Sequence, residues 1–223
     1  MKIAAILKFS ALDYPGKLSG VVFCQGCPLR CGYCHNPNFL DPSLSENVLH
    51  EEFLSFLKNR VGLLEAIVFS GGEPLLQPDL MESIKLAKDL GYSVGIHTSG
   101  IIPDALKSVL PMLDWVGLDV KTCFELYENI TNTPGSGNYA AESLDIILAS
   151  GVNYEARTTY DSRNITESDL INIARVLGSR GVHKWVIQEC IIRGDEPPIP
   201  IPLPPQTVLS EIATYIHVEL RRS

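Results

Sequence analysis

Short runs of β-branched and aromatic residues alternate with helical patterns along most of this chain. The strand-like runs are residues 21–23, 66–69, 92–97, 115–120, 152–160 and 183–187. Between them, apolar residues recur at the spacing of one helical face, as Leu80, Ile84 and Ala87 do before the stop signal at Gly91. Repeated strand–helix units joined by short loops predict a parallel sheet whose crossovers are right-handed.

The number of these units bounds the architecture. Six units in 223 residues fall short of the eight that close a complete barrel, which takes about 250 residues. We therefore expect an α/β fold, namely a partial, TIM-like (β/α)6 barrel with one open side. A doubly wound sheet is the alternative, because periodicity alone does not separate the two architectures.

The ends of this pattern indicate the domain organisation. Residues 1–194 are expected to form the barrel, with residues 1–18 as a lead-in to the first parallel strand. Residues 195–223 are expected to form a proline-rich connector and a C-terminal extension packed on the same domain. The connector, residues 195–205 (DEPPIPIPLPP), is too rich in proline for a helix or a central strand. Residues 133–138 (TPGSGN) are expected to form a mobile loop.

Charge and hydropathy exclude several classes of partner. The formal net charge is −8 and no basic stripe is present, so we expect no nucleic-acid partner. No apolar run reaches the length of about 18 residues that a membrane span needs, so we expect no membrane partner. Residues 1–6 lack the small-residue cleavage site of a signal peptide. These observations predict a cytoplasmic protein.

Four of the six cysteines lie between positions 24 and 34, in the segment CQGCPLRCGYC. A structural zinc site usually takes two CxxC pairs separated by roughly 12 to 20 residues. A dithiol redox motif would use one such pair and leave the other cysteines unexplained, and an all-cysteine ferredoxin cluster has CxxC spacing throughout. The remaining interpretation is a four-iron cluster with three cysteine ligands, which leaves one iron open to a small molecule. Either Cys24, Cys27 and Cys31 or Cys27, Cys31 and Cys34 supply that triplet.

The second triplet, CxxxCxxC with Tyr33 before its last cysteine, resembles the signature of the radical S-adenosylmethionine (SAM) family. The wider segment FCQGCPLRCGYCHNP and the opening LKFSALDYPGK are similar to the activating enzymes of glycyl-radical proteins. Among these they resemble the activators of anaerobic ribonucleoside-triphosphate reductase. Matching motifs run from residue 7 to residue 190. The resemblance implies that Cys27, Cys31 and Cys34 bind a [4Fe–4S] cluster, that SAM is the second cofactor, and that Cys24 is a packed bystander.

Polar side chains at the ends of the predicted strands are candidates for cofactor contacts. Gly71 and Gly72 permit the close approach of a ligand, and Glu73 offers a carboxylate to an ammonium group. A plain strand-ending turn is the alternative. Asp119 and Lys121 are two residues apart and share one face of a strand, where an internal ion pair is the alternative.

The resemblance assigns roles to these and to further residues. It implies that the Gly71–Glu73 motif holds the amino group of the cofactor, and that Lys121 contacts its carboxylate beside Asp119. The remaining contacts that it implies are Tyr33, Thr98, Ser99 and Arg157, with Thr98 and Ser99 near the ribose. His97 stands where related activators carry an aspartate of a monovalent-cation site, and an uncharged imidazole is a poor ligand for such a cation.

The reaction that the resemblance implies is reductive cleavage of SAM to a 5′-deoxyadenosyl radical. That radical would then generate a glycyl radical on a partner enzyme, anaerobic ribonucleoside-triphosphate reductase above all, with a flavodoxin or ferredoxin as electron donor. One alternative is a radical SAM enzyme that acts on a small molecule, similar to 7-carboxy-7-deazaguanine synthase. An alternative of another class is a non-catalytic zinc or iron–sulfur binding module.

Overall fold

The computed structural model describes residues 1–192 and 199–222, and within them eight strands form one sheet. In chain order these strands are β1 (Ile3–Ser10), β2 (Ser19–Cys24), β3 (Ala66–Gly71), β4 (Ser93–Thr98), β5 (Trp115–Asp119), β6 (Asn153–Tyr160), β7 (Trp185–Glu189) and β10 (Val218–Arg221). Strands β2 to β7 and β10 pair in parallel, while β1 pairs antiparallel with β2.

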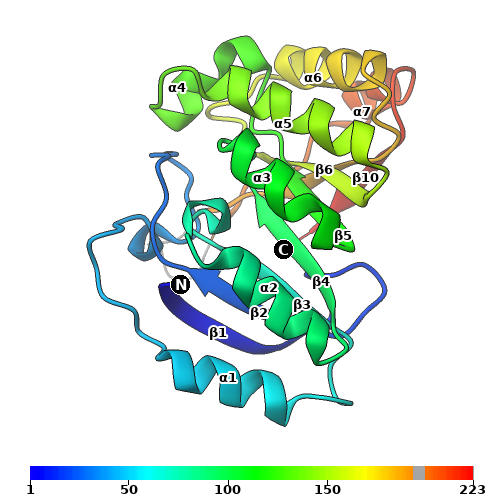
Figure 1. Ribbon diagram of the computed structural model, residues 1–223. Helices are drawn as coiled ribbons and strands as arrows, with labels where there is room; N and C mark the ends of the chain where they lie inside the picture. The colour runs from blue at the N-terminus through cyan, green and yellow to red at the C-terminus, as the bar shows by residue number, and fades with distance from the viewer. Residues whose placement is uncertain (193–198, 223) are drawn as a thin grey trace.

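Helices fill the crossovers between the parallel strands (Figure 1). They are α1 (His50–Asn59), α2 (Leu80–Asp89), α3 (Pro103–Val109), α4 (Tyr127–Thr131), α5 (Ser136–Ser150), α6 (Glu167–Ser179) and α7 (Gln206–Ile212), with short 3-10 turns at Pro37–Phe39, Pro74–Leu76, Leu110–Met112 and Phe124–Leu126. The start of α6 is a capping box: the Thr166 hydroxyl accepts from the Asp169 N–H, and the Asp169 carboxylate accepts from the Thr166 N–H.

The strand order separates the two candidate architectures. In a doubly wound sheet the order reverses at the first strand. Here each parallel strand lies beside the next one in the chain, in the order β2-β3-β4-β5-β6-β7-β10. Right-handed crossovers in one unbroken direction place the helices on one face and curl the sheet around the other. The six predicted parallel strands are β2 to β7, so the partial barrel is confirmed, with β1 and β10 at its two open edges.

The core has an outer and an inner part. Most buried apolar side chains lie between the sheet and the helices. A smaller cluster fills the hollow of the barrel and consists of Tyr14, Val21, Ala66, Val68 and Trp115. The rings of Tyr14 and Trp115 lie 5.6 Å apart, so the segment before β2 supplies the side chain that plugs the barrel.

The structure differs from the sequence prediction at residues 133–138 and at strand β10. Residues 133–138 were expected to be a loop, but α5 begins at Ser136. A Cβ atom at Gly137 would lie 1.9 Å from the carbonyl oxygen of Phe124, so this glycine allows the helix to pack against the preceding turn. Strand β10 was not expected at all.

Of the proline-rich connector, residues 195–198 lie outside the described residues. Ile199–Pro200 form β9, which pairs antiparallel with β8 (Ile191–Ile192). Helix α7 follows and packs beside α6.

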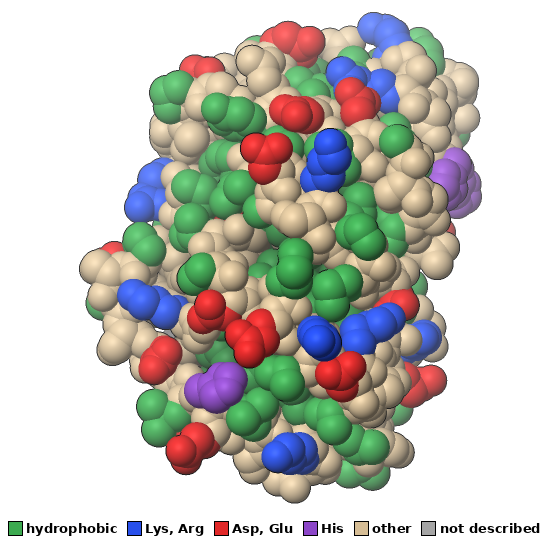
Figure 2. Space-filling view, in the orientation of Figure 1, with side chains coloured by type: hydrophobic (Ala, Val, Ile, Leu, Met, Phe, Trp, Pro, Cys, Tyr) green, Lys and Arg blue, Asp and Glu red, His purple; other side chains and the backbone are tan. Residues whose placement is uncertain are grey.

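The visible surface carries charges of both signs. Figure 2 shows acidic and basic side chains interspersed over one face of the molecule, the face that carries α2, α3 and α5 in Figure 1. No helix in the described part of the chain is long and apolar enough to cross a bilayer.

The substitution Gly137→Ala is expected to destabilise the protein by about 1–3 kcal/mol, because the added methyl group forces the first turn of α5 away from Phe124. Thermal unfolding should show a Tm lowered by about 2–4 °C for each kcal/mol. Asn138→Ala in the same turn is the control, since Asn138 is exposed. Equal Tm values for the two variants would contradict the packing argument.

Candidate active site

The carboxyl ends of the parallel strands surround a cavity of 310 Å³. Three cysteines line it from the loop after β2, and polar residues from the ends of β3, β4, β5 and β6 complete the wall. The predicted site residues that line this cavity are Cys27, Cys31, Tyr33, Cys34, Gly71, Gly72, Thr98, Ser99, Asp119, Lys121 and Arg157. Glu73 is the predicted residue that does not.

Backbone hydrogen bonds hold the cysteine loop in place. The N–H of Cys27 donates to the carbonyl of Leu40, and the N–H of Arg30 donates to the carbonyl of Thr131 at the end of α4. The Arg30 guanidinium donates to the carbonyl of Cys27, 2.6 Å away. The loop is therefore tied to segments on both of its sides, and the cysteines are carried by a braced backbone.

Cys24 is separated from the other three cysteines of the segment. Its side chain is fully buried at the end of β2, and its sulfur lies 3.8 Å from the sulfur of Met1. It does not line the cavity, whereas Cys27, Cys31 and Cys34 do. The geometry therefore favours the second triplet over the first.

The three thiols have the chemistry of cluster ligands. Burial raises the pKa of Cys27 to about 12, with the nearby Glu73 carboxylate adding to it, so metal binding must release a proton from this thiol. Among the described residues, no three Cys, His, Asp or Glu side chains converge to hold one metal ion. A four-iron cluster takes each thiolate on a different iron, and the thiols of Cys27, Cys31 and Cys34 all belong to residues that line one cavity.

Glu73 does not present its carboxylate to the cavity. Its side chain is only 1 % exposed and accepts hydrogen bonds from the Thr98 hydroxyl at 2.7 Å and from the Ser99 N–H at 2.9 Å. The Ser99 hydroxyl and the Leu75 N–H also donate to it. Groups of the chain itself thus occupy the carboxylate here, and its expected role toward an ammonium group stays a prediction. Glu73 instead ties the turn after β3 to the end of β4.

Gly71 and Gly72 allow the backbone of the turn after β3 to lie directly against the backbone of the cysteine loop. A Cβ atom at Gly72 would lie 2.2 Å from the carbonyl oxygen of Gly26, and one at Gly71, where φ is +108°, would lie 2.4 Å from the nitrogen of Cys24. The N–H of Glu73 also donates to the carbonyl of Gly26. The turn after β3 thus packs directly on the cysteine loop, and only glycine fits there.

Lys121 supplies a buried positive charge to the cavity wall. Its ammonium nitrogen lies 3.4 Å from a carboxylate oxygen of Asp119 and 5.9 Å from the centre of the Tyr33 ring. Burial by itself lowers the pKa of Lys121, but Tyr33, Asp119 and Cys31 raise it well above its usual value. The ion pair that the sequence left as an alternative is present, and Lys121 nevertheless lines the cavity.

Sequence reasoning missed Tyr127, which positions this lysine. Its hydroxyl accepts from the Lys121 N–H at 2.9 Å and donates to the Asp119 carbonyl at 3.1 Å. The side chain is almost wholly buried at the start of α4. A lone tyrosine in a helical segment carries no signal in the sequence that would reveal this bridge.

His97 anchors the segment before β2 to the mouth of the barrel. Its Nε2 lies 2.9 Å from the carbonyl oxygen of Asp13, which makes Nε2 the protonated nitrogen, and its Nδ1 lies 3.4 Å from the Ser70 hydroxyl. Burial, with the positive charge of Arg157 nearby, lowers the pKa of His97 well below its usual value. The imidazole is therefore neutral at physiological pH, and both of its nitrogens have partners in the chain.

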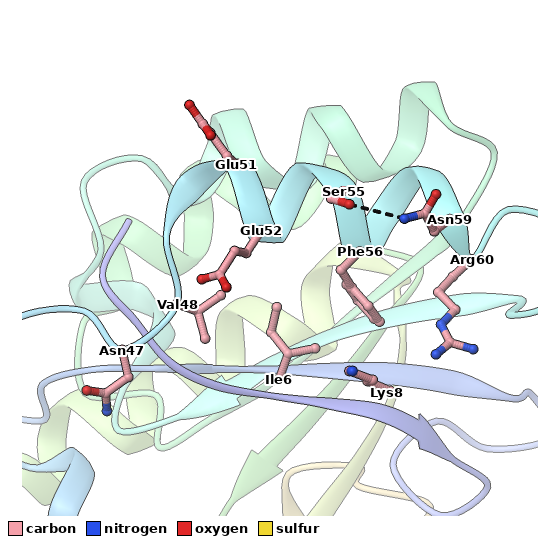
Figure 3. Close-up of a pocket in the computed structure, with 10 residues that line it drawn as sticks. All are labelled: Ile6, Lys8, Asn47, Val48, Glu51, Glu52, Ser55, Phe56, Asn59 and Arg60. Atoms are coloured by element: carbon pink, nitrogen blue, oxygen red, sulfur yellow. Dashed lines mark hydrogen bonds between the residues drawn. The ribbon is translucent and has the colours of Figure 1, made fainter.

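A second hollow, of 520 Å³, lies between β1 and α1. Figure 3 shows its lining, with Ile6 and Lys8 on the strand facing Phe56 on the helix and Arg60 just after the helix ends. None of the residues that line it is a cysteine or a histidine. The cavity at the cysteine loop is the candidate active site because it gathers three cysteines with the cations of Lys121 and Arg157.

Comparisons with known proteins show which proteins this chain is similar to. The model of the Radical SAM superfamily matches residues 21–177, a range that includes every predicted site residue. A protein of Methanocaldococcus jannaschii that is assigned as a glycyl-radical enzyme activating enzyme is 31% identical over 94% of this chain and 89% of its own length.

Two further proteins are similar over part of their length. The pyruvate formate-lyase-activating enzyme of Clostridium pasteurianum is 37% identical over 54% of this chain and 52% of its own, so the match spans about half of that enzyme. The crystal structure of a radical SAM methyltransferase from Sphaerobacter thermophilus aligns with a TM-score of 0.70 at 18% identity, over 94% of this chain and 67% of that one. This structural likeness shows the fold.

The substitution Glu73→Gln separates a structural role from a binding role. An amide would point a donor at the groups that donate to Glu73 and leave one of them unpaired, so we expect a loss of stability of about 1–3 kcal/mol in the cofactor-free protein. Chemical denaturation measures it. Glu82→Gln, in the exposed face of α2, is the control. Unchanged stability would indicate that Glu73 is free to bind a ligand.

Proposed function

The chain belongs to the radical SAM superfamily, whose members use a [4Fe–4S] cluster and SAM, and from this premise we propose that it activates a glycyl-radical enzyme. The observation that carries the proposal is the cavity that gathers Cys27, Cys31 and Cys34 with the buried cation of Lys121. The relative from Methanocaldococcus jannaschii supports it, because the similarity extends over nearly the whole of both chains.

The three cysteines are proposed to hold the cluster. When bound, the cluster and SAM supply the reducing electron and the sulfur–carbon bond whose cleavage yields methionine and a 5′-deoxyadenosyl radical. The chain's own residues bind and orient the cofactor and keep water away from it. The half-buried ring of Tyr33 forms part of the wall beside the cysteines.

The polar residues of the cavity are proposed to hold the SAM molecule. Lys121 and Arg157 are cations that line the cavity, and they suit the cofactor carboxylate. Thr98 and Ser99 are expected near the ribose, and Asp119 lies beside Lys121. The Gly71–Glu73 motif is proposed to receive the cofactor amino group, with the backbone of Gly71 and Gly72 at the cavity wall and the Glu73 carboxylate behind it.

We further propose anaerobic ribonucleoside-triphosphate reductase as the partner. The residues that follow the last cysteine, His35-Asn36-Pro37, and the opening segment support this choice through their similarity to activators of that reductase. The gap in the sheet between β1 and β10 gives a peptide loop of the partner a side from which to approach. A flavodoxin or ferredoxin is the proposed electron donor, and the cytoplasm the proposed compartment.

Cluster binding is tested by single substitutions of the cysteines. Anaerobic reconstitution with iron and sulfide should give a brown protein, and Cys27→Ala, Cys31→Ala and Cys34→Ala should each lose most of the bound iron. Cys24→Ala is the matched control and should keep its iron. Iron and sulfide content and visible absorption measure the outcome. A variant Cys24→Ala without a cluster beside a loaded Cys34→Ala would assign the other triplet.

The partner is tested by electron paramagnetic resonance. The reduced protein, mixed with SAM and the anaerobic reductase, should release 5′-deoxyadenosine and produce the doublet signal of a glycyl radical. Cys31→Ala provides the control, which should give neither product. Release of 5′-deoxyadenosine without a glycyl signal from the reductase or other glycyl-radical enzymes would favour a small-molecule substrate. A colourless protein that binds zinc and no iron would contradict both enzyme proposals.

A further inference from the structure

A buried group of charges connects the last strand of the sheet to the cavity. Glu155 and Arg157 are two residues apart on β6, so their side chains share the inner face of the strand. The Nε of Arg157 donates to Oε1 of Glu155 at 2.6 Å. From β10, Arg221 donates to both oxygens of the same carboxylate, at 2.8 Å and 3.2 Å. Glu155 is 1 % exposed.

Arg157 lies where it can serve a ligand. Its side chain lines the cavity and is 5 % exposed. The guanidinium carbon lies 4.8 Å from the centre of the Trp115 ring. The absence of a side chain at Gly117 makes room for it, since a Cβ atom there would lie 2.8 Å from that carbon. Stacking and packing therefore fix the plane of the guanidinium.

One nitrogen of this guanidinium has no hydrogen-bond acceptor. The Nη2 of Arg157 is buried and makes no hydrogen bond with the described residues. A buried donor left without an acceptor is costly, and native proteins rarely keep one without a reason. An acceptor brought into the cavity by a ligand would satisfy it.

The balance of charge around Glu155 suits an anionic ligand group. This single carboxylate faces Arg157 and Arg221, and the ammonium of Lys184 lies 3.7 Å from its Oε2. Lys184 also pairs with Glu219 at 3.1 Å. The two carboxylates thus face three cations, and one positive charge is left uncompensated. A carboxylate on a ligand in the cavity would balance it.

Arg221 limits the number of hydrogen bonds that the Glu155 carboxylate forms with Arg157. Arginine–carboxylate pairs favour two parallel hydrogen bonds, and Glu155 would form them with Arg157 if its second oxygen were free. Arg221 and Lys184 occupy that oxygen. Arg157 therefore keeps a single hydrogen bond to Glu155, and its Nη2 has no acceptor among the described residues.

We propose that Glu155 and Arg221 are positioning residues for cofactor binding, which hold the guanidinium of Arg157 with Nη2 directed to the carboxylate of SAM. The proposal rests on the proposed function. Through Arg221, strand β10 supports the site although it contributes no residue to the cavity wall. Losing Arg221 would let Glu155 rotate and withdraw Nη2 from the ligand.

The test is the affinity of the anaerobically reconstituted full-length protein for SAM, measured by isothermal titration calorimetry. Arg221→Ala should bind SAM about tenfold more weakly, the effect of one weakened charge-assisted hydrogen bond. Arg222→Ala removes the same charge from the exposed neighbouring residue and should bind normally. Arg221→Lys should bind as weakly as Arg221→Ala, because lysine does not span both carboxylate oxygens. Full recovery with lysine would indicate a general charge effect and overturn the positioning role.

Two further measurements separate positioning from a loss of structure. Decarboxylated SAM, which lacks the group that Nη2 is proposed to bind, should bind Arg221→Ala and the wild type equally well. Arg221→Ala should add no further loss to a chain that already carries Arg157→Ala. A loss for the decarboxylated probe, or additive losses in the double variant, would overturn the inference. If Arg221→Ala fails to fold, Arg221→Gln takes its place in both measurements.

The outcomes also separate this inference from the proposed function. A wild-type protein that carries its cluster and does not bind SAM would overturn both. A wild-type protein that binds SAM with the same affinity as Arg221→Ala would overturn the positioning role alone.

Discussion

The contact between two backbones, the turn after β3 and the cysteine loop after β2, is the constraint on which the site depends. At Gly71 and Gly72 the two segments lie too close for any side chain between them. Hydrogen bonds from the N–H groups of Gly72 and Glu73 to the carbonyls of Cys24 and Gly26 join them. The buried carboxylate of Glu73 extends this joint to β4. Three strand ends therefore form one rigid unit, and the cysteines project from it into the cavity.

Much of the fold and of the site followed from the sequence because both rest on local patterns. The six parallel strands were visible as short β-branched runs. The resemblance to a known family singled out Cys27, Cys31 and Cys34 as the expected ligands, and these three cysteines line one cavity. What failed depends on contacts between distant segments. The helical start at Ser136 exists because Gly137 fits against Phe124, and no local rule reveals such a fit. The short, charged β10 has no strand signal and forms by pairing with β7.

The assignment of Glu73 shows a different limit of sequence reasoning. The motif Gly-Gly-Glu was placed correctly at the end of a strand, beside the cysteines. The role expected of its carboxylate stays a prediction, because hydroxyl and N–H groups at the end of the neighbouring strand β4 already donate to that carboxylate in this structure. A residue type indicates which chemistry is available. Only the set of neighbouring donors decides whether that chemistry is directed to a ligand or to the protein itself.

The strand order of the sheet also bears on how the chain folds. Every parallel strand pairs with its neighbour in sequence from β2 to β7, so each new pairing closes only the single crossover between two consecutive strands. The entropy lost in such closures grows slowly with loop length, and short-range pairings favour fast folding. A closed ring would add a final pairing between the first and last strands, across nearly the whole chain. The open barrel lacks that pairing, so its parallel strands pair only with strands that are close in the sequence.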